Sequence, residues 1–298
     1  MNNSETSVSD PRKEHLLHGK LKEYKKPLIL KAGNLTMLYE AGSIRYVSCG
    51  RTELLRMIYV AVRDPEWNTI NPVISDETIR KSDDSFLISY RSLFRSGDAE
   101  FAADTIIEGK PDSSIIFSFK GEARTPFQKN RAGICVLHPV HGYAGLSCEI
   151  IHINGVKEFS EFPLHIAPFQ PFTEIKSMKW IIAGCANTLS FAGDVFETED
   201  QRNWTDASYK TYCTPLRLPF PVTLPKGEKV SQKAELTLRS SPPVPGKMQK
   251  YATIKLVRKN ETCLPLTGIG RSTRPEPLSE NEIRLLSKLK FDHYRIDL

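Results

Sequence analysis

The chain has 298 residues with 40% hydrophobic and 26% charged residues, ordinary values for a globular protein of one large or two smaller domains that needs no disulfide or metal for stability. The net charge of +6 is a mild excess, much of it before residue 27, and no basic stripe with interleaved aromatic residues follows it, so nucleic-acid binding is not expected. No apolar run approaches the roughly 18 residues of a membrane-spanning helix, so a membrane partner is not expected either.

The six cysteines are scattered, without a Cys-x-x-Cys spacing. In a long chain this pattern is typical of buried thiols in a reducing compartment, and not of a disulfide frame or a zinc site. Residues 1–26 are polar and lack the apolar segment of a secretory signal. The sequence also lacks the Gly-x-Ser-x-Gly, P-loop, Gly-x-Gly-x-x-Gly and His-Glu-x-x-His motifs. We therefore expect a cytoplasmic protein without a metal or other cofactor.

Short strands dominate the pattern once the N-terminal residues are passed. Residues 1–27 predict a disordered or loosely attached tail. The run 54–63 is apolar almost throughout, as in a strand covered on both faces, and Asp64-Pro65 ends it. Turn residues separate the predicted strands, which are 43–47, 54–63, 86–90, 99–108, 114–122, 132–140, 148–154, 178–183, 188–196, 208–214 and 231–239. Without a long amphipathic helix among them, these strands predict a mostly β fold, a large two-sheet β-sandwich over residues 28–246.

The pattern changes after a proline-rich segment, residues 240–246, which predicts a linker. One more strand is predicted over Ala252–Arg258. A helix follows, with Ser279 at its N-cap and Glu282 three residues later, the spacing of a capping box.

The last residues, Phe291–Leu298, again predict a strand. A helix and a strand after a β-sandwich and a linker are how a β/α barrel often begins. We therefore expect residues 247–298 to be the start of an incomplete barrel domain whose remainder follows Leu298.

The densest group of polar side chains lies between two predicted strands, in residues 197–212. Carboxylates could bind hydroxyl groups or act as a general base, the arginine could hold a carboxylate or polarise a carbonyl, and the tryptophan could stack on a sugar ring. The candidate residues are Glu199, Asp200, Arg202, Asn203, Trp204 and Asp206. The alternative is a strand-turn-strand corner whose charges pair with one another and whose tryptophan lies in the core.

Two further segments carry candidate residues. The predicted strand 132–140 has Arg131 at one end, where it could stabilise negative charge, and His138 near the other, where it could act as an acid or base. The His138-x-x-His141 spacing is a weak sign of a metal site, because the sequence offers no third ligand. The alternative is a pair of exposed loop histidines.

The segment 162–172 is rich in proline and phenylalanine and predicts a stiff, extended stretch. It would cover a sheet edge, or form a pocket wall into which His165 and Gln170 reach. The turn around Trp67 would similarly either line a cleft or cap the preceding strand.

Four of these stretches together resemble a known family. The runs 58–64, 130–139, 168–172 and 199–208 are similar to the N-terminal part of the D-apionate lactonases, bacterial enzymes of apiose breakdown that open D-apionolactone to D-apionate. The resemblance covers roughly residues 30–298 and implies a longer protein, in which a barrel-like domain and a further C-terminal part follow. It assigns no catalytic residue to a position here. The sandwich is also similar to the supersandwich of galactose mutarotases, by architecture alone, which implies no activity.

The resemblance implies a sugar-acid lactonase whose partner is a sugar lactone or sugar acid. Lactone hydrolysis needs a base to activate water and donors for the developing oxyanion. Asp200, Glu199 or His138 would be that base, Arg131 and Arg202 the donors. Two alternatives remain: a carbohydrate-binding or scaffolding sandwich without catalysis, and a mutarotase-like epimerase that uses a carboxylate and His138.

Overall fold

The structure is a computed structural model that describes residues 26–240, 265–271 and 276–296. Contacts divide the chain into two compact units, Met1–Gly246 and Lys247–Leu298. The predicted tail up to residue 25, residues 241–246 of the proline-rich segment and the predicted strand 252–258 lie outside the described residues. Within the described part, no helix has the length and apolar character needed to cross a membrane.

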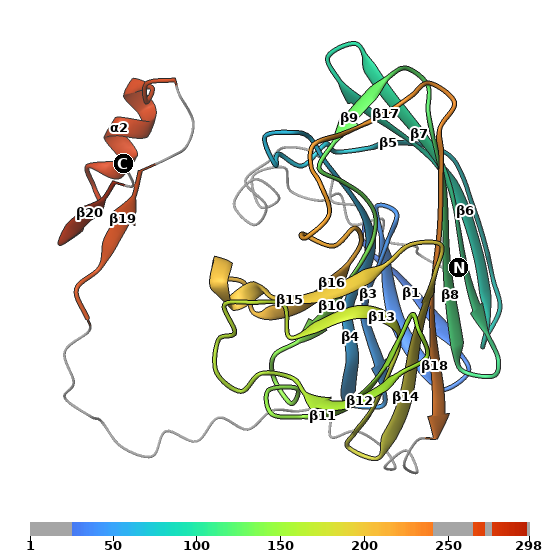
Figure 1. Ribbon diagram of the computed structural model, residues 1–298. Coiled ribbons are helices and arrows are strands. Elements are labelled where there is room, and N and C mark those ends of the chain that lie inside the picture. The colour runs from blue at the N-terminus through green and yellow to red at the C-terminus, as the bar shows by residue number, and fades with distance from the viewer. Residues whose placement is uncertain (1–25, 241–264, 272–275, 297–298) are drawn as a thin grey trace, which may run out of the picture. The chain divides into compact units, whose positions relative to one another are not determined.

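Sixteen strands of the first unit form one continuous sheet (Figure 1). Along one half the hydrogen-bonded order is β1 (Leu28–Ala32), β2 (Leu35–Glu40), β3 (Ser43–Cys49), β4 (Thr52–Arg63), β10 (Arg131–Pro139), β16 (Ser208–Tyr212), β15 (Phe196–Asp200) and β13 (Phe172–Ile182). The order continues through β14 (Cys185–Ala192), β18 (Lys229–Ser240), β8 (Ser114–Ala123), β7 (Ala99–Lys110), β6 (Phe86–Ser96) and β5 (Val73–Lys81). Neighbouring strands along this path run antiparallel, for example β10 beside β4 and β16.

Three smaller features complete this unit. The hairpin of β11 (Ser147–His152) and β12 (Lys157–Glu161) joins the sheet through β13. A separate pair is formed by β9 (Phe127–Lys129) and β17 (Val222–Leu224). A short 3-10 helix, η1 (Gln201–Trp204), connects β15 to β16.

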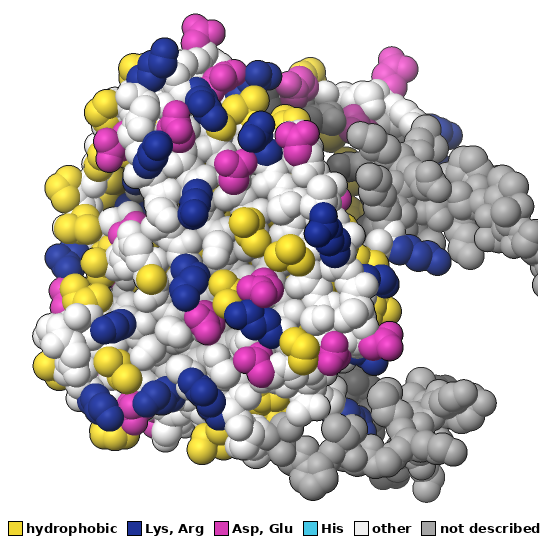
Figure 2. All heavy atoms as spheres, turned by 90° about the vertical axis from the view of Figure 1, so that its right-hand side faces the viewer, with side chains coloured by type: hydrophobic (Ala, Val, Ile, Leu, Met, Phe, Trp, Pro, Cys, Tyr) yellow, Lys and Arg dark blue, Asp and Glu magenta, His cyan; other side chains and the backbone are white. Residues whose placement is uncertain are grey.

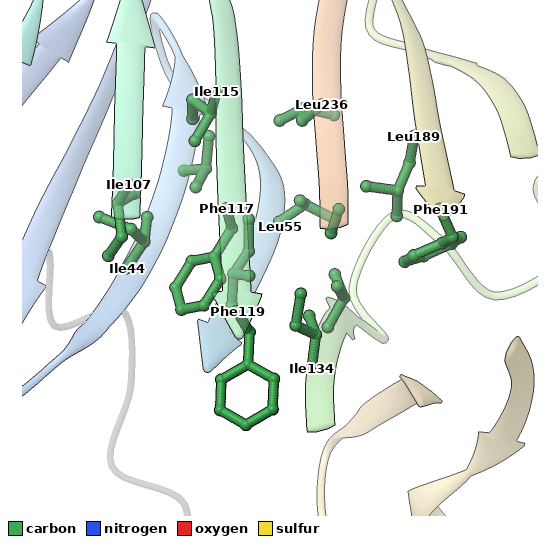
Figure 3. Packing of buried hydrophobic residues seen from close by; sticks show 14 of the residues in the cluster. Ile44, Leu55, Ile107, Ile115, Phe117, Phe119, Ile134, Leu189, Phe191 and Leu236 are labelled. Atoms are coloured by element: carbon green, nitrogen blue, oxygen red, sulfur yellow. The ribbon is translucent and has the colours of Figure 1, made fainter. Parts of the chain in front are cut away.

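The core lies between the two halves of this sheet (Figure 3). Ile115, Phe117 and Phe119 of β8 point from one half toward Ile44 and Ile134 of the other, and all five are fully buried. Because side chains alternate along a strand, each apolar position on β8 is followed by one on the opposite face. Burial of such residues in one contiguous cluster is the main stabilising contribution to a fold of this kind.

The outer face of β6, β7, β8 and β18 is charged instead of apolar (Figure 2). Asp104 of β7 lies opposite Arg91 of β6 and Lys120 of β8, and Arg91 and Asp104 form an ion pair at 3.2 Å. Figure 2 shows cations and anions intermixed over this face, with apolar side chains between them. Such a mixture is typical of a solvated surface.

The predicted mostly β class agrees with the structure, and the two expected sheets prove to be two halves of one continuous sheet. The strands of this unit missing from the predicted set are β1, β2, β5, β9, β12, β15 and β17. In two of them, β5 and β12, nearly all residues are exposed. Because neither strand buries a regular face, neither carries the alternation of apolar and polar residues from which strands are predicted.

The second unit contains β19 (Gly268–Gly270), α2 (Glu280–Leu286) and β20 (His293–Arg295). The predicted capping box is present: Ser279 accepts a hydrogen bond from the Glu282 backbone N–H, and the Glu282 side chain accepts one from the Ser279 backbone N–H. The two strands pair in parallel, with Ile269 opposite Tyr294. A strand, a helix and a parallel strand are the unit from which β/α barrels are built, so the expected barrel start stays a prediction compatible with this arrangement.

Candidate functional site

A pocket of about 560 Å³ lies over β4, β10, β16 and β15. Its floor is an apolar cluster separate from the main core, formed by Ala61, Cys135 and Tyr212 with Tyr59 packed against it. Its walls are polar and aromatic, and they include Arg63, Trp67, Arg131, Glu199, Gln201, Trp204 and Lys210. A few polar groups converging on an apolar floor are typical of a small-molecule site.

Because side chains alternate along a strand, the pocket residues of each strand lie on the same face of the sheet. In β4, Tyr59 and Ala61 belong to the pocket, while Ile58 and Val62 lie in the main core. This explains why the run 54–63 is apolar on both faces: one face meets the core and the other lines the pocket. The pairs across the strands are Cys135 with Tyr59, Cys135 with Tyr212, Glu199 with Lys210 and Arg131 with Arg63.

Gly133 sits between Arg131 and Cys135 in β10, where a side chain has no room. An added Cβ would overlap the Gln232 amide and the Cys213 sulfur. The Gln232 amide cannot simply move, because Oε1 accepts the Ile134 backbone N–H at 2.8 Å and Nε2 donates to Asp194 at 3.1 Å. Glycine therefore allows the strand to approach these groups closely.

We expect Gly133→Ala to lower the free energy of unfolding by about 1–3 kcal/mol, since the extra methyl overpacks a closed site. Urea denaturation of the variant and the unaltered chain measures the difference. An unchanged midpoint and slope would mean that Gln232 and Cys213 move aside without a loss of stability.

Glu199 carries the negative charge of the pocket. It forms an ion pair with Lys210, the residue opposite it on β16, and accepts a hydrogen bond from Gln201 Nε2 at 2.6 Å. The side chains of Glu199 and Lys210 remain 18% and 17% exposed, so both can reach a ligand. The Lys210 ammonium also lies 5.1 Å from the centre of the Tyr212 ring.

The two tyrosines of the floor are hydrogen-bond donors. Burial raises the pKa of Tyr59 and of Tyr212 well above the ordinary value, and the neighbouring Glu199 and Glu197 raise that of Tyr212 further. Both phenols therefore stay protonated at neutral pH. The Tyr212 hydroxyl donates to Glu197 at 2.6 Å, and Gln170 acts on the same hydroxyl.

Arg131 is the buried cation of the pocket, only 5% exposed. Its guanidinium lies 5.1 Å from the Trp67 ring and 5.5 Å from the Phe220 ring. Burial lowers its pKa, while Tyr212 and Glu197 act in the opposite direction. An arginine remains charged under such conditions.

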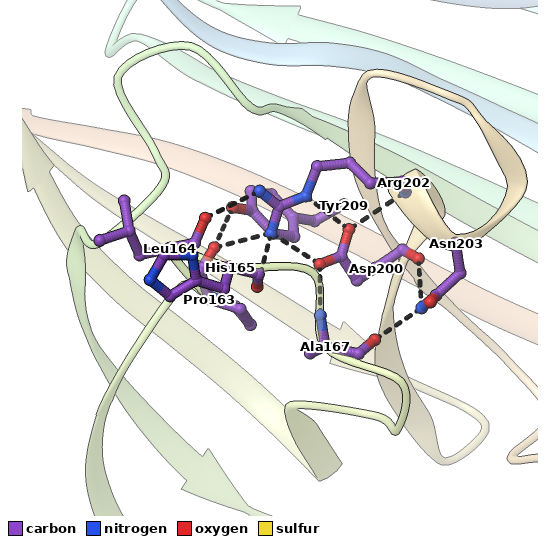
Figure 4. A network of polar contacts seen from close by, with 8 residues as sticks. All are labelled: Pro163, Leu164, His165, Ala167, Asp200, Arg202, Asn203 and Tyr209. Atoms are coloured by element: carbon purple, nitrogen blue, oxygen red, sulfur yellow. Dashed lines mark hydrogen bonds and ion pairs between the residues drawn. The ribbon is translucent and has the colours of Figure 1, made fainter.

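Asp200 and Arg202, by contrast, form a closed network behind the pocket (Figure 4). Arg202 donates to both oxygens of Asp200, at 2.7 and 2.9 Å, and to the backbone carbonyls of Pro163, Leu164 and His165. Burial works to raise the pKa of Asp200, but the hydrogen bonds from Arg202 and from the Ala167 backbone N–H outweigh it and lower that pKa.

The network ties the proline-rich stretch to η1. Asn203 donates to the Ala167 carbonyl at 2.6 Å, and the Tyr209 hydroxyl donates to Pro163 at 2.6 Å. The Asp200 side chain is fully buried. The placement of Asp200, Arg202 and Asn203 thus matches the alternative of a corner whose charges pair with one another.

His138 is buried in the main core. It is fully inaccessible, and its ring lies 5.4 Å from Phe162 and 5.9 Å from Trp180. Burial lowers its pKa to about 3, so the ring is neutral. Its position in β10 alternates with that of Cys135 and Leu137, which puts it on the face away from the pocket.

The remaining candidate residues, Trp204, Asp206 and Gln170, differ in their positions. Trp204 is 73% exposed at the pocket rim, so it is not the core tryptophan of the alternative. Asp206 is exposed and close enough to act on Tyr59. Gln170 reaches the Tyr212 hydroxyl, as described above. Within the described residues, no three His, Cys, Asp or Glu side chains come together as a possible metal site.

Sequence reasoning missed the pocket residues on the strands themselves, chiefly Tyr59, Lys210 and Tyr212. Each belongs to a strand that we predicted, and period-two alternation from Arg131 through Cys135 would have placed their side chains on a shared face once the pairing of strands was known. The turn around Trp67 does line the pocket, one of its two interpretations.

A broader hollow of about 1030 Å³ covers the outer face of β11, β13 and β14. Two of its charged groups, Glu149 and Lys179, pair at 3.0 Å, and its apolar members Phe159 and Ile181 are 80% and 65% exposed. The smaller pocket has the buried, converging polar groups and is the better candidate site.

Most of this chain is similar in sequence to a known family. The family described as "D-apionate lactonase, N-terminal domain" matches residues 15–241. D-apionate lactonase of Brucella anthropi is 35% identical over 225 residues, which are 75% of this chain and 37% of the relative. The chain thus spans well under half the length of that relative.

Among solved structures, two similar ones differ strongly in sequence. The Slr1438 protein of Synechocystis sp. PCC 6803 is 8% identical with a TM-score of 0.48, over 72% of this chain and 96% of the other. A galactose mutarotase related enzyme of Lactobacillus acidophilus is 8% identical with a TM-score of 0.41, over 72% of this chain and 98% of the other.

Proposed function

This chain belongs to the family of the D-apionate lactonase N-terminal domain, and from that premise we propose that its pocket binds a sugar lactone and takes part in opening the ring to the sugar acid. The proposal is carried by one observation: Glu199, Lys210 and Arg131 converge over an apolar floor beside two tryptophans. Charged groups and aromatic faces together suit a small ligand with many hydroxyl groups.

In the proposed reaction Glu199 is the base. Its carboxylate takes a proton from a water molecule, whose oxygen forms a bond to the lactone carbonyl carbon. Arg131 and the phenol of Tyr59 are the donors that stabilise the oxyanion. When the ring C–O bond breaks, Lys210 gives a proton to the departing oxygen, and the proton on Glu199 restores Lys210 through their ion pair.

This proposal changes the assignment of the base. Asp200 is buried and committed to Arg202, and His138 lies in the core. Of the three candidates for the base, Glu199 alone lines the pocket. The epimerase alternative relied on His138, so the buried position of that ring removes its support.

The binding alternative has an observation in its favour. The chain spans 37% of the length of its relative, so the chemistry could depend on residues outside this chain, with the pocket serving to bind the sugar. A barrel domain as a partner of this sandwich is part of the same proposal.

The test is acid release from D-apionolactone by the chain, followed in a pH-stat, together with calorimetric binding. We expect Glu199→Gln to reduce turnover by about 100-fold or more, because a positioned base contributes about that much, and to leave the chain folded. Glu235→Gln, which removes a partly exposed charge from the outer face of β18, is the matched control and should leave turnover unchanged.

The outcomes separate the two functions. Lactone binding without turnover selects the binding function. Turnover that survives Glu199→Gln rules out Glu199 as the base, and the absence of lactone binding rules out both functions.

A further inference from the structure

Arg131 lines the pocket and has an unused pair of hydrogen-bond donors. Its Nη1 donates to the Asn130 carbonyl at 2.7 Å. Its Nε and Nη2 are buried and, among the described residues, have no hydrogen-bond partner. The N–H groups on these two nitrogens point the same way in the guanidinium plane and form the fork that matches both oxygens of a carboxylate.

The nearby carboxylates are engaged elsewhere. Glu197 accepts the Tyr212 hydroxyl at 2.6 Å and the Leu216 backbone N–H at 2.7 Å through one oxygen. Glu199 pairs with Lys210. Both act on Arg131 only from a distance, and no ion pair of Arg131 occurs within residues 26–240.

A buried cation without an ion-pair partner is costly, because it loses its hydration without a compensating anion. The aromatic rings of Trp67 and Phe220 offset part of that cost and hold the guanidinium in place. They leave the donor fork free, in a residue that lines the pocket. An anionic ligand with two coplanar oxygens would satisfy what is missing.

We propose that Arg131 forms a carboxylate-binding site, and that the pocket therefore binds the open-chain sugar acid more tightly than neutral sugars of the same size. The identity of this acid as the reaction product rests on the proposed function. The carboxylate-binding site itself requires only a ligand with a carboxylate beside hydroxyl groups. A lactone has no carboxylate and cannot offer two anionic oxygens to the fork. The acid should consequently inhibit its own formation.

The experiment compares D-ribonate with ribitol by isothermal titration calorimetry on the full chain. The two ligands have equal numbers of carbons and differ in one terminal group, a carboxylate or a hydroxymethyl. We expect ribonate to bind at least about tenfold more tightly, and Arg131→Gln to reduce its affinity to that of ribitol. Equal affinities of the two ligands for the unaltered chain would overturn the proposal, whether or not the variant folds.

Arg63→Gln is the matched control. Arg63 lies opposite Arg131 on β4 and lines the same pocket, but its Nη1 already donates to the Trp67 carbonyl at 3.2 Å. We expect it to weaken ribonate binding by less than about threefold, the effect of a nearby charge without a direct contact. If it weakens binding as much as Arg131→Gln does, a general positive potential holds the anion, and the fork does not.

Failure of this proposal is distinguishable from failure of the proposed function. Lactone turnover with equal affinities for ribonate and ribitol would support the hydrolase function and contradict the carboxylate-binding site. A ribonate preference that depends on Arg131, without turnover of lactone, would support the carboxylate-binding site and contradict the hydrolase function.

Discussion

Arg202→Ala is expected to lower the free energy of unfolding by about 3–5 kcal/mol, the effect of removing one partner from a buried ion pair. The reason is the environment of Asp200, whose side chain is fully buried and would keep its charge without the guanidinium. The carbonyls of Pro163, Leu164 and His165 would lose their common donor at the same time. Urea denaturation at neutral pH measures the change.

Arg217→Ala is the comparison that isolates burial. Arg217 pairs with Glu174 at the similar distance of 2.8 Å, but the two side chains are 55% and 39% exposed. Pairs at the surface contribute at most about 1 kcal/mol, because water and salt screen them. If both variants lose the same small amount, the Asp200 network is a surface feature in solution and does not hold the stretch 163–167.

The strand content could be predicted from sequence because most strands bury one face. β8 and β4 show this clearly, since apolar residues recur at every second position or throughout. β5 could not be predicted, because its residues are exposed and hydrogen bonds to β6 alone place it in the sheet. The continuity of the sheet was equally hidden, since pairing between strands distant in sequence, such as β18 with β8, leaves no local pattern.

The candidate site was predicted as a region but not as a set of side chains. The segment 197–212 contains both the pocket residues and the structural network, because successive residues of β15 point to opposite faces. Glu199 therefore lines the pocket, while its neighbour Asp200 is fixed behind it. Which face is the pocket depends on the partners of β15 in space, and composition does not contain that information.

His138 makes the second large prediction, a loss of stability in mild acid. Burial lowers its pKa from an ordinary 6.5 to about 3 in the folded protein. Below pH 6.5 the unfolded chain therefore binds a proton that the folded chain does not bind. The free energy of unfolding falls by about 1.4 kcal/mol per pH unit until the pKa of the folded state is approached. Over the whole window the loss is on the order of 5 kcal/mol.

The measurement is the free energy of unfolding in urea at several pH values between 7 and 4, for the unaltered chain and for His138→Gln. Glutamine does not titrate and can retain a hydrogen bond to Thr211, which His138 Nε2 contacts at 2.9 Å. The variant should be less stable at pH 7 but should lose less on acidification. His141→Gln, in an exposed loop, should follow the unaltered chain.

Two parallel curves would contradict the burial of a neutral imidazole. The pH window also separates this effect from that of Asp200, whose lowered pKa keeps its contribution intact until below its ordinary value near 3.8. A slope between pH 6.5 and 4 that disappears only in His138→Gln therefore reports the histidine alone. It would also establish that this ring is neutral and enclosed at neutral pH, which leaves the chemistry of the pocket to Glu199 and its neighbours on the opposite face of the sheet.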